Sequence, residues 1–339
     1  MPSHIGPFII AFVITIVLTP IVRWLCVRFS LNAPPNPIIA SHKTSTPTLG
    51  GVSVFIAFMV AIGIYFRMAE QSYYFLKLFF GVLPIFLMGI YDDLKSLTVK
   101  FKGLMEIILV IFFILFYRLR PDFNIFLPFD YFLMLLWFVG VINAFNLIDI
   151  MDGLASGIGL FASLGFFVMA SHAGRPDLMI ICSALSGCYL AFLYYNFNPA
   201  KIFLGDNGSL VMGLSLAYVG FELVGHEPLS PRAMAPVIIL AIPIFEVFLL
   251  ITRRLKKKIP ILKGSPDHLG LVLQALGNSI PRSAIIVYVS SVILDILGIW
   301  VMTSGMAVQV GVSLFVILVG IILLSLMVRI EVPEKSKDV

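Results

Sequence analysis

The chain has 339 residues, of which 60% are hydrophobic and only 12% are charged. Soluble domains carry about 25% charged residues, so this composition excludes a soluble globular protein and indicates an integral membrane protein. The formal net charge of +5 does not indicate nucleic-acid binding, because aromatic and basic residues do not interleave in polar segments. The three cysteines lie in apolar sequence without metal-ligand spacing, so we expect buried thiols.

Eleven apolar runs follow one another, each near or somewhat below the roughly 20 residues needed to cross a bilayer. They are 7–25, 49–66, 74–91, 104–118, 130–145, 153–171, 178–195, 208–224, 234–252, 283–303 and 307–328. The first run is followed at once by others, which favours a retained span over a signal peptide. We therefore expect an all-α polytopic integral membrane protein of about eleven transmembrane helices, forming a single domain over residues 1–339.

The basic residues predict the orientation of these spans. The odd-numbered loops and the C-terminus carry 17 of the 23 lysines and arginines, and the other side carries 6. Basic loops stay in the cytoplasm, so we expect the N-terminus outside and the C-terminus cytoplasmic. Positive-inside sorting does not explain the acidic residues, yet a set of aspartates also falls on the cytoplasmic side: Asp92, Asp93, Asp149, Asp152, Asp206 and Asp267. This clustering predicts one shared polar site.

The segment NAFNLIDIMDGLAS, residues 143–156, is the most polar feature at a span end. Asn143, Asn146, Asp149 and Asp152 recur every third residue, which on a helix places them along one face. Carboxylates near lipid are costly unless they face water, a cation or a cavity. A helix end capped by Asn and Asp is the simpler alternative for any one of these residues, but four in register favour a functional site.

Two glycine-containing loops suit phosphate binding. HKTSTPTLGG, residues 42–51, combines Lys43 with hydroxyl groups and two glycines, although a plain polar turn explains it equally well. NFNPAKIFLGDNGSLVMG, residues 196–213, places Asp206 between glycines before an apolar helix, where it is either a site residue or a helix cap. Phe203 is either a lipid-facing ring or a ring that stacks on a base.

The loop YDDLKSLTVKFKG, residues 91–103, carries adjacent carboxylates at a span end. Asp92 and Asp93 could share a divalent cation, or one could act as a base. Lys102 precedes the next span and favours phosphate binding, whereas the other lysines of this loop fit topology alone. Glu106 lies one helical turn beyond Lys102, and we consider the two as partners.

The longest polar loop, residues 252–282, has two parts. TRRLKKK is first a topology anchor and lipid-headgroup contact, and second a candidate for substrate binding. GSPDHLG then brings Asp267 and His268 together; such a histidine is usually solvated, but this one could reach the shared site. Carboxylates and amides without soft ligands favour Mg²⁺, and Mg²⁺ beside lysines at a membrane face favours chemistry on a phosphate-bearing lipid or nucleotide.

At this point the sequence resembles the polyprenyl-phosphate N-acetylhexosamine-1-phosphate transferases, the glycosyltransferase family 4 type. The matching pieces occur in the family's order over nearly the whole chain: PTLGG (47–51), DDLKSLTVKFKG (92–103), NAFNLIDIMDGLASG (143–157), FLGDNGSLVMG (203–213) and DHL (267–269). The resemblance implies transfer of a HexNAc-1-phosphate from a UDP-sugar to undecaprenyl phosphate, giving undecaprenyl-diphosphate-sugar and UMP and initiating cell-envelope glycan or lipopolysaccharide synthesis. It also implies multi-pass insertion in the bacterial inner (plasma) membrane with the active site facing the cytoplasm.

The resemblance also assigns roles to residues. Asp206 and Asn146 look like Mg²⁺ ligands. Asp92 and Asp93 would lie at the lipid-phosphate end, one of them as a base, and Lys102 would balance phosphate charge beside them. The active site would be formed by cytoplasmic loops 25–48, 92–103, 146–152, 196–207 and 252–282.

On the donor side, the resemblance implies that Lys43 balances phosphate charge and that Asp149, Asp152 and a stacking Phe203 hold the uridine. His268 would be the one imidazole left from a family string that commonly continues with further histidines and an arginine. Two departures stand out: Gly270, Leu271 and Val272 replace that string, and Ile150 stands where the family usually has glycine. The missing triple histidine makes the translocase branch less favoured.

Two other functions stay open from the sequence. A polytopic transporter would use the same acidic cytoplasmic site, although transporters usually place ionisable residues near the midplane. A catalytically altered family member would only bind lipid phosphate or nucleotide. The expected partners are undecaprenyl phosphate, a UDP-sugar and the lipid bilayer, with no nucleic acid. Whether the chain forms a homodimer, and which UDP-HexNAc it uses, are left open.

Overall fold

The computed structural model describes residues 4–33, 45–121, 126–224 and 230–332. Its elements, in chain order, are α1 Ile5–Arg28, β1 Asn32–Ala33, β2 Thr46–Pro47, α2 Gly50–Met68, α3 Ser72–Lys95, α4 Val99–Tyr117, α5 Leu127–Ile148, α6 Leu154–His172, α7 Pro176–Asn196, α8 Asp206–Val224, the 3₁₀ turn η1 Pro231–Ala233, α9 Met234–Ile239, α10 Ala241–Lys256, α11 Leu269–Ala275, α12 Ile280–Thr303 and α13 Met306–Met327. The strands form one short antiparallel pair in which Asn32 faces Pro47.

The helices confirm an all-α polytopic protein. Each of the eleven apolar runs lies on a helix, except that the ninth is divided between α9 and α10, which are bent by 78° with η1 included. Within the described ranges, nine helices are long and apolar enough to cross a membrane, or ten if the bent pair counts as one span. The remaining run lies on α4, which carries Lys100, Lys102 and Glu106. The number of spans and their orientation stay predictions.

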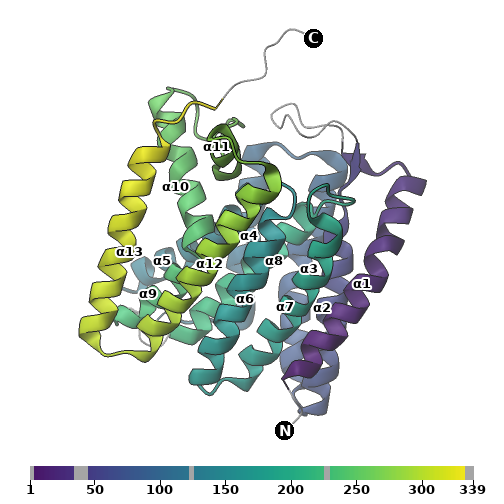
Figure 1. Ribbon diagram of the computed structural model, residues 1–339. Helices are drawn as coiled ribbons and strands as arrows, with labels where there is room; N and C mark the ends of the chain where they lie inside the picture. Colours follow the sequence, from purple (N-terminus) through teal and green to yellow (C-terminus); the bar gives the residue numbers. More distant parts are fainter. Residues whose placement is uncertain (1–3, 34–44, 122–125, 225–229, 333–339) are drawn as a thin grey trace.

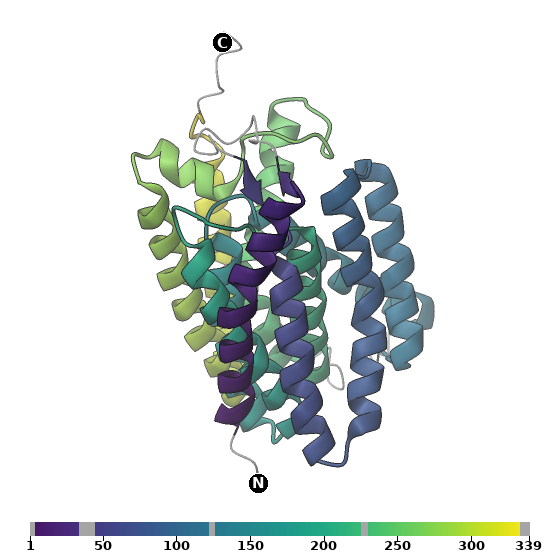
Figure 2. The same ribbon diagram turned by 90° about the vertical axis from the view of Figure 1, so that its right-hand side faces the viewer.

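Helix α8 is the centre of the bundle and α13 its edge. In α8, 83% of the best apolar window is buried, against 11% in α13 and 28% in α1 and α12. The packing of α8 against α2, α3, α5 and α6 explains the difference. Figures 1 and 2 show α1 and α13 at the periphery of the same bundle. The apolar side chains on these outer helices therefore face lipid. A helix can stand against lipid because its backbone hydrogen bonds are satisfied within the helix.

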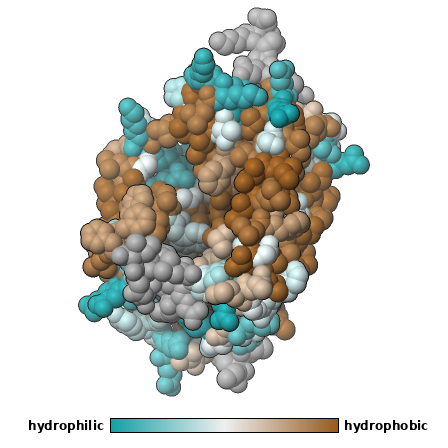
Figure 3. All heavy atoms as spheres, turned by 90° about the vertical axis from the view of Figure 1, so that its left-hand side faces the viewer, coloured by the Kyte–Doolittle hydropathy of each residue, from teal (hydrophilic) through white to brown (hydrophobic). Residues whose placement is uncertain are grey.

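The helix order places chemically related ends together. Figure 1 shows α1 beginning at the bottom and α13 ending at the top, so the described chain starts and finishes at opposite ends of the bundle. Figure 1 shows α11 at the top, and side-chain contacts join the ends of α3 and α5 to the starts of α4 and α8. The face in Figure 3 has a hydrophobic band with hydrophilic side chains above and below it, as expected for a membrane protein.

Candidate active site

Four helices bring a polar cluster together at one end of the bundle. The ammonium of Lys102, near the start of α4, lies 2.5 Å from Asp206 Oδ2, 3.0 Å from Asp92 Oδ2 and 3.2 Å from Asn146 Oδ1. Asn146 in turn donates from Nδ2 to Asp206 Oδ1 at 2.6 Å and to Ser209 Oγ at 3.1 Å. Oxygen atoms from α3, α5 and α8 therefore converge on one cation and accept its hydrogen bonds.

The adjacent aspartates of α3 have different surroundings. Asp93 accepts the first backbone N–H groups of α8, from Asp206 and Asn207, at 3.0 Å each, and the Asn207 side-chain amide at 2.5 Å. It therefore caps α8 and holds Asp206 in place. Asp92 accepts the backbone N–H of Leu97 at 2.6 Å with Oδ1 and faces Lys102 with Oδ2. Of the pair, Asp92 directs an oxygen to the shared cation.

The glycines of PTLGG and FLGDNG serve close packing between α2 and the start of α8. The backbone N–H groups of Gly50 and Gly51 donate to the carbonyls of Phe203 and Leu204 at 3.0 and 2.8 Å. A Cβ at Gly51 would lie 2.2 Å from Asn207 Oδ1. Gly205 has φ +74°, and a Cβ there would meet the Thr48 carbonyl at 2.1 Å. These contacts support a packing role for the glycines. Lys43 lies outside the described residues.

The prediction that four residues share one helix face is wrong for Asp149 and Asp152. Helix α5 ends at Ile148, and Asp149 and Asp152 lie in the turn that leads to α6. Gly153, with φ +74°, completes this turn, and a left-handed residue stops a regular helix. Only Asn143 and Asn146 project from α5. They also diverge, because Asn143 donates to Glu106 Oε2 at 2.6 Å. Glu106 therefore accepts its hydrogen bond from Asn143, and the expected direct pair with Lys102 does not form.

The two aspartates of the turn have separate roles. Asp152 accepts from Asn198 Nδ2 at 2.8 Å and from the Ala200 backbone at 3.0 Å, which ties the 196–205 loop to the turn. Asp149 keeps a partly accessible surface, although protein atoms surround its carboxyl group. Burial raises the pKa of Asp149 to about 8, and the nearby carboxylates of Asp206 and others add to the increase. Phe203, also partly exposed, lies on the same loop as Asp206.

His268 is enclosed by protein groups. Its Nδ1 lies 2.6 Å from Glu246 Oε1, and Glu246 Oε2 accepts the backbone N–H of Leu269 at 2.8 Å. Glu246 is fully buried and His268 is only 5% exposed. The pair fixes the start of α11 on α10, so His268 is an anchored side chain and not a solvated one.

The arginines of TRRLKKK point inward. Arg253 donates to Asp267 Oδ1 at 2.9 Å and to the Met327 carbonyl at 2.6 Å. Arg254 donates to Ser265 Oγ at 3.0 Å and to the Ile261 carbonyl. Burial acts to raise the pKa of Asp267, but hydrogen bonds from Lys257 and Arg253 outweigh it and lower the pKa. The arginines therefore hold the loop together, and a lipid-headgroup role is left to the lysines.

The residues that replace the family's histidine string are buried in α11. Gly270, Leu271 and Val272 all lie in the interior. A Cβ at Gly270 would lie 3.0 Å from Met151 Sδ, so α11 packs closely on the turn after α5. This packing favours a small residue at position 270.

Sequence reasoning missed the individual roles of Asn207, Ser209 and Glu246. Asn207 and Ser209 were inside the quoted GDNGS string, but their partners are on other helices. Glu246 was detectable as a single carboxylate within an apolar run, because such residues usually have a buried partner.

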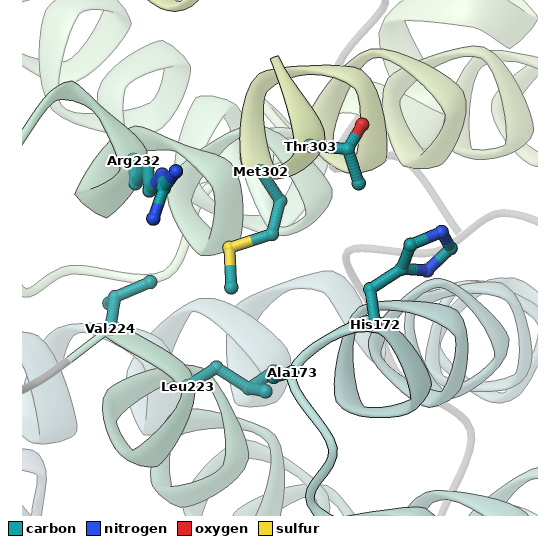
Figure 4. Close-up of a pocket in the computed structure, with 7 residues that line it drawn as sticks. All are labelled: His172, Ala173, Leu223, Val224, Arg232, Met302 and Thr303. Carbon is teal, nitrogen blue, oxygen red and sulfur yellow. The ribbon is translucent and has the colours of Figure 1, made fainter. Parts of the chain in front are cut away.

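Other regions offer weaker sites. A cavity of about 500 Å³ at the opposite end of the bundle is lined by His172, Ala173, Leu223, Val224, Arg232, Met302 and Thr303, and Figure 4 shows these side chains around it. No carboxylate is among these described lining residues.

In the described part of the chain, no group of three or more His, Cys, Asp or Glu side chains is arranged to hold a metal ion. In the polar cluster, the amide oxygen of Asn146 is the protein ligand that could join the carboxylates at a cation.

Comparison with known proteins supplies the family. Residues 75–224, which span α3 to α8 and the polar cluster, match the family model described as glycosyl transferase family 4. The chain is 32% identical to the "Probable undecaprenyl-phosphate N-acetylglucosaminyl 1-phosphate transferase" of Bacillus subtilis (strain 168), over 97% of this chain and 93% of that one.

Two relatives carry another name. The phospho-N-acetylmuramoyl-pentapeptide-transferase of Listeria monocytogenes serotype 4b (strain CLIP80459) is 33% identical over 66% of this chain and 76% of its own. That of Staphylococcus epidermidis (strain ATCC 12228 / FDA PCI 1200) is 30% identical over 86% and 97%. The resemblance drawn from the motifs is confirmed: the chain belongs to glycosyl transferase family 4, the polyprenyl-phosphate phospho-sugar transferases.

Proposed function

We propose that this protein transfers a HexNAc-1-phosphate from a UDP-sugar to undecaprenyl phosphate, releasing UMP. The Bacillus subtilis relative, similar along almost the whole chain, makes N-acetylglucosamine the first donor sugar to test. The reaction takes place at the cytoplasmic face of the bacterial plasma membrane, where the product begins a cell-envelope glycan. The whole of 1–339 acts as one membrane-embedded domain, with the five loops named above around the active site.

The observation that carries this proposal is the convergence of Asp92, Asn146 and Asp206 on the Lys102 ammonium. These oxygens form a pocket for positive charge at the end of an apolar bundle. Transfer between two phosphate groups concentrates negative charge at one point, so catalysis depends on positioning and charge neutralisation. A cluster that already binds a cation from three helices is suited to that task.

The same donors fit Mg²⁺. Carboxylate and amide oxygens are hard ligands, and Mg²⁺ is usually held by one or two carboxylates together with substrate phosphate. Asp206 and Asn146 would hold the ion, and when bound it would neutralise charge on the diphosphate. Lys102 occupies the point where these oxygens meet, so we expect its ammonium to move toward the phosphates when a divalent cation binds.

The remaining residues orient the reactants. An oxygen of the acceptor phosphate attacks the β-phosphorus of the UDP-sugar; the new P–O bond forms as the bond to the bridging oxygen breaks, and UMP leaves with the electron pair. A phosphate monoester is nucleophilic at neutral pH, so Asp92 needs only to orient it or take its last proton. Asp93 acts through α8, which it caps. Asp149 and Phe203 would face the nucleoside end, and Asp152 ties the loop that carries Phe203 to the turn that carries Asp149.

The test is release of UMP by purified protein with undecaprenyl phosphate, Mg²⁺ and a panel of UDP-sugars, with EDTA as the metal control. Metal-dependent UMP release with one donor, and none without the lipid, is the expected result. No release from protein that still binds UDP or the lipid would favour the altered binder. Transport of the UDP-sugar across the membrane of reconstituted vesicles, without cleavage of its diphosphate, would instead favour the transporter.

A further inference from the structure

A second polar hollow lies outside the carboxylate cluster. The end of α10 and the residues after α13 enclose a pocket of about 350 Å³. None of its lining residues comes from α3, α4, α5 or α8. Its charged lining residues are Arg253, Lys256, Lys257, Arg329 and Glu331.

Positive charge exceeds negative charge in this pocket. Arg253 and Lys257 share the single carboxylate of Asp267, at 2.9 and 2.8 Å. Lys256 donates to the Val328 carbonyl at 3.4 Å. No carboxylate of the described segments forms an ion pair with Lys256 or Arg329. Counting Asp267 and Glu331 against the four basic residues, the pocket has a surplus of two positive charges and favours an anion.

An apolar cavity of about 330 Å³ lies between the same helices and α12. It is lined by Phe245 of α10, Leu294 of α12, Gly320 and Met327 of α13, and neighbouring apolar residues. The two hollows adjoin at Met327, whose side chain lines the apolar cavity and whose carbonyl accepts the Arg253 guanidinium. Phe245 and Arg253 are about 12 Å apart along α10 at 1.5 Å per residue. The basic pocket therefore sits at the polar end of an apolar slot.

We infer that this pair of hollows binds an anionic phospholipid of the bilayer, with its phosphate in the basic pocket and part of an acyl chain in the slot. Helix α13 is exposed along almost its whole apolar length, so a lipid can enter sideways. Figure 3 shows the hydrophobic band of this side with hydrophilic side chains gathered above it. Basic pockets between helices at a cytoplasmic membrane boundary bind anionic headgroups.

Native mass spectrometry of the detergent-purified full chain tests the headgroup. Phosphatidylglycerol and phosphatidylcholine with identical acyl chains are titrated separately. We expect phosphatidylglycerol to bind more tightly, and Lys256→Gln with Arg329→Gln to weaken its binding by about tenfold or more. The matched control removes two exposed basic residues outside the pocket, Lys263→Gln with Arg282→Gln, and should leave the preference unchanged.

A glycine pair tests the slot. Gly320 lines the apolar cavity and Gly311, on the same helix, does not, and a Cβ at either position would meet no atom within 4 Å. Gly320→Leu should weaken binding of both phospholipids because it fills the chain site, and Gly311→Leu should not. Neither change alters charge.

Three results would overturn the inference. The first is that the two phospholipids bind equally tightly. The second is that the charge variant and its control lose the same amount of phosphatidylglycerol binding. The third is that undecaprenyl phosphate is the lipid whose binding depends on Lys256 and Arg329. The measurement needs no UDP-sugar and no turnover, so its outcome is independent of the transferase proposal.

Discussion

Two charged regions lie at the same end of the bundle and differ in how their charges are matched. In the cluster of Lys102, Asp92 and Asp206, charges from three helices meet at one point, and the oxygens outnumber the cation. At the loop between α10 and α12, each buried carboxylate already has a local partner: Glu246 pairs with His268, and Asp267 with Arg253 and Lys257. The first arrangement is open, because it can accept another cation, while the second is closed to a cation, because its carboxylates are already paired. Charge density alone does not identify a candidate metal site; carboxylate oxygens left in excess of their cation do.

The largest effect should come from removing an oxygen of the open cluster. Asp206→Ala and Asp92→Ala should each lower the rate of UMP release by about 10³-fold or more, because charge stabilisation at the reacting phosphates is lost. Size-exclusion profiles in detergent should stay those of the unaltered protein. Near-normal turnover in either variant would remove that aspartate from the mechanism.

The next effect concerns the cation itself. Lys102→Ala should lower the rate by about 10²-fold, whereas Lys100→Ala, two positions earlier and exposed, should change it little. Without the ammonium the carboxylates repel one another, so Mg²⁺ should raise the melting temperature of Lys102→Ala more than that of the unaltered chain. An identical Mg²⁺ response in both proteins would contradict the shared site.

In the closed region, stability should change more than catalysis. Glu246→Ala leaves His268 and the Leu269 N–H without their acceptor, which costs about 1–3 kcal/mol. The melting temperature should fall, while the remaining folded protein keeps most of its kcat. A large loss of kcat without a change in melting temperature would show that this loop takes part in chemistry.

The smallest effect is a pH dependence at the edge of the open cluster. The pKa of Asp149 is raised to about 8 in the folded protein, above its value of about 3.9 when unfolded. The folded state therefore binds the extra proton, and its stability falls as pH rises between these values. Asp149→Asn removes this loss, so its melting temperature should exceed that of the unaltered chain increasingly from pH 5 to pH 8. A constant difference across that range would argue against a protonated Asp149.

The sequence by itself determined the all-α membrane fold, the positions of the long apolar helices and the family, because hydropathy and motifs are local properties of the chain; the break between α9 and α10 and the short helix α11 were not foreseen. It also selected the members of the open cluster. Only the tertiary structure decided how they meet: Lys102 and Asp206 are 104 positions apart, and no local pattern specifies such a pairing. The same holds for Asp93 as the cap of α8 and for Glu246 as the partner of His268, since each depends on helix packing. The three-residue spacing predicted that the helix would continue past Ile148, but it ends there and Asp149 lies in a turn. Periodicity describes the face of a helix, whereas packing and the left-handed Gly153 decide where the helix ends.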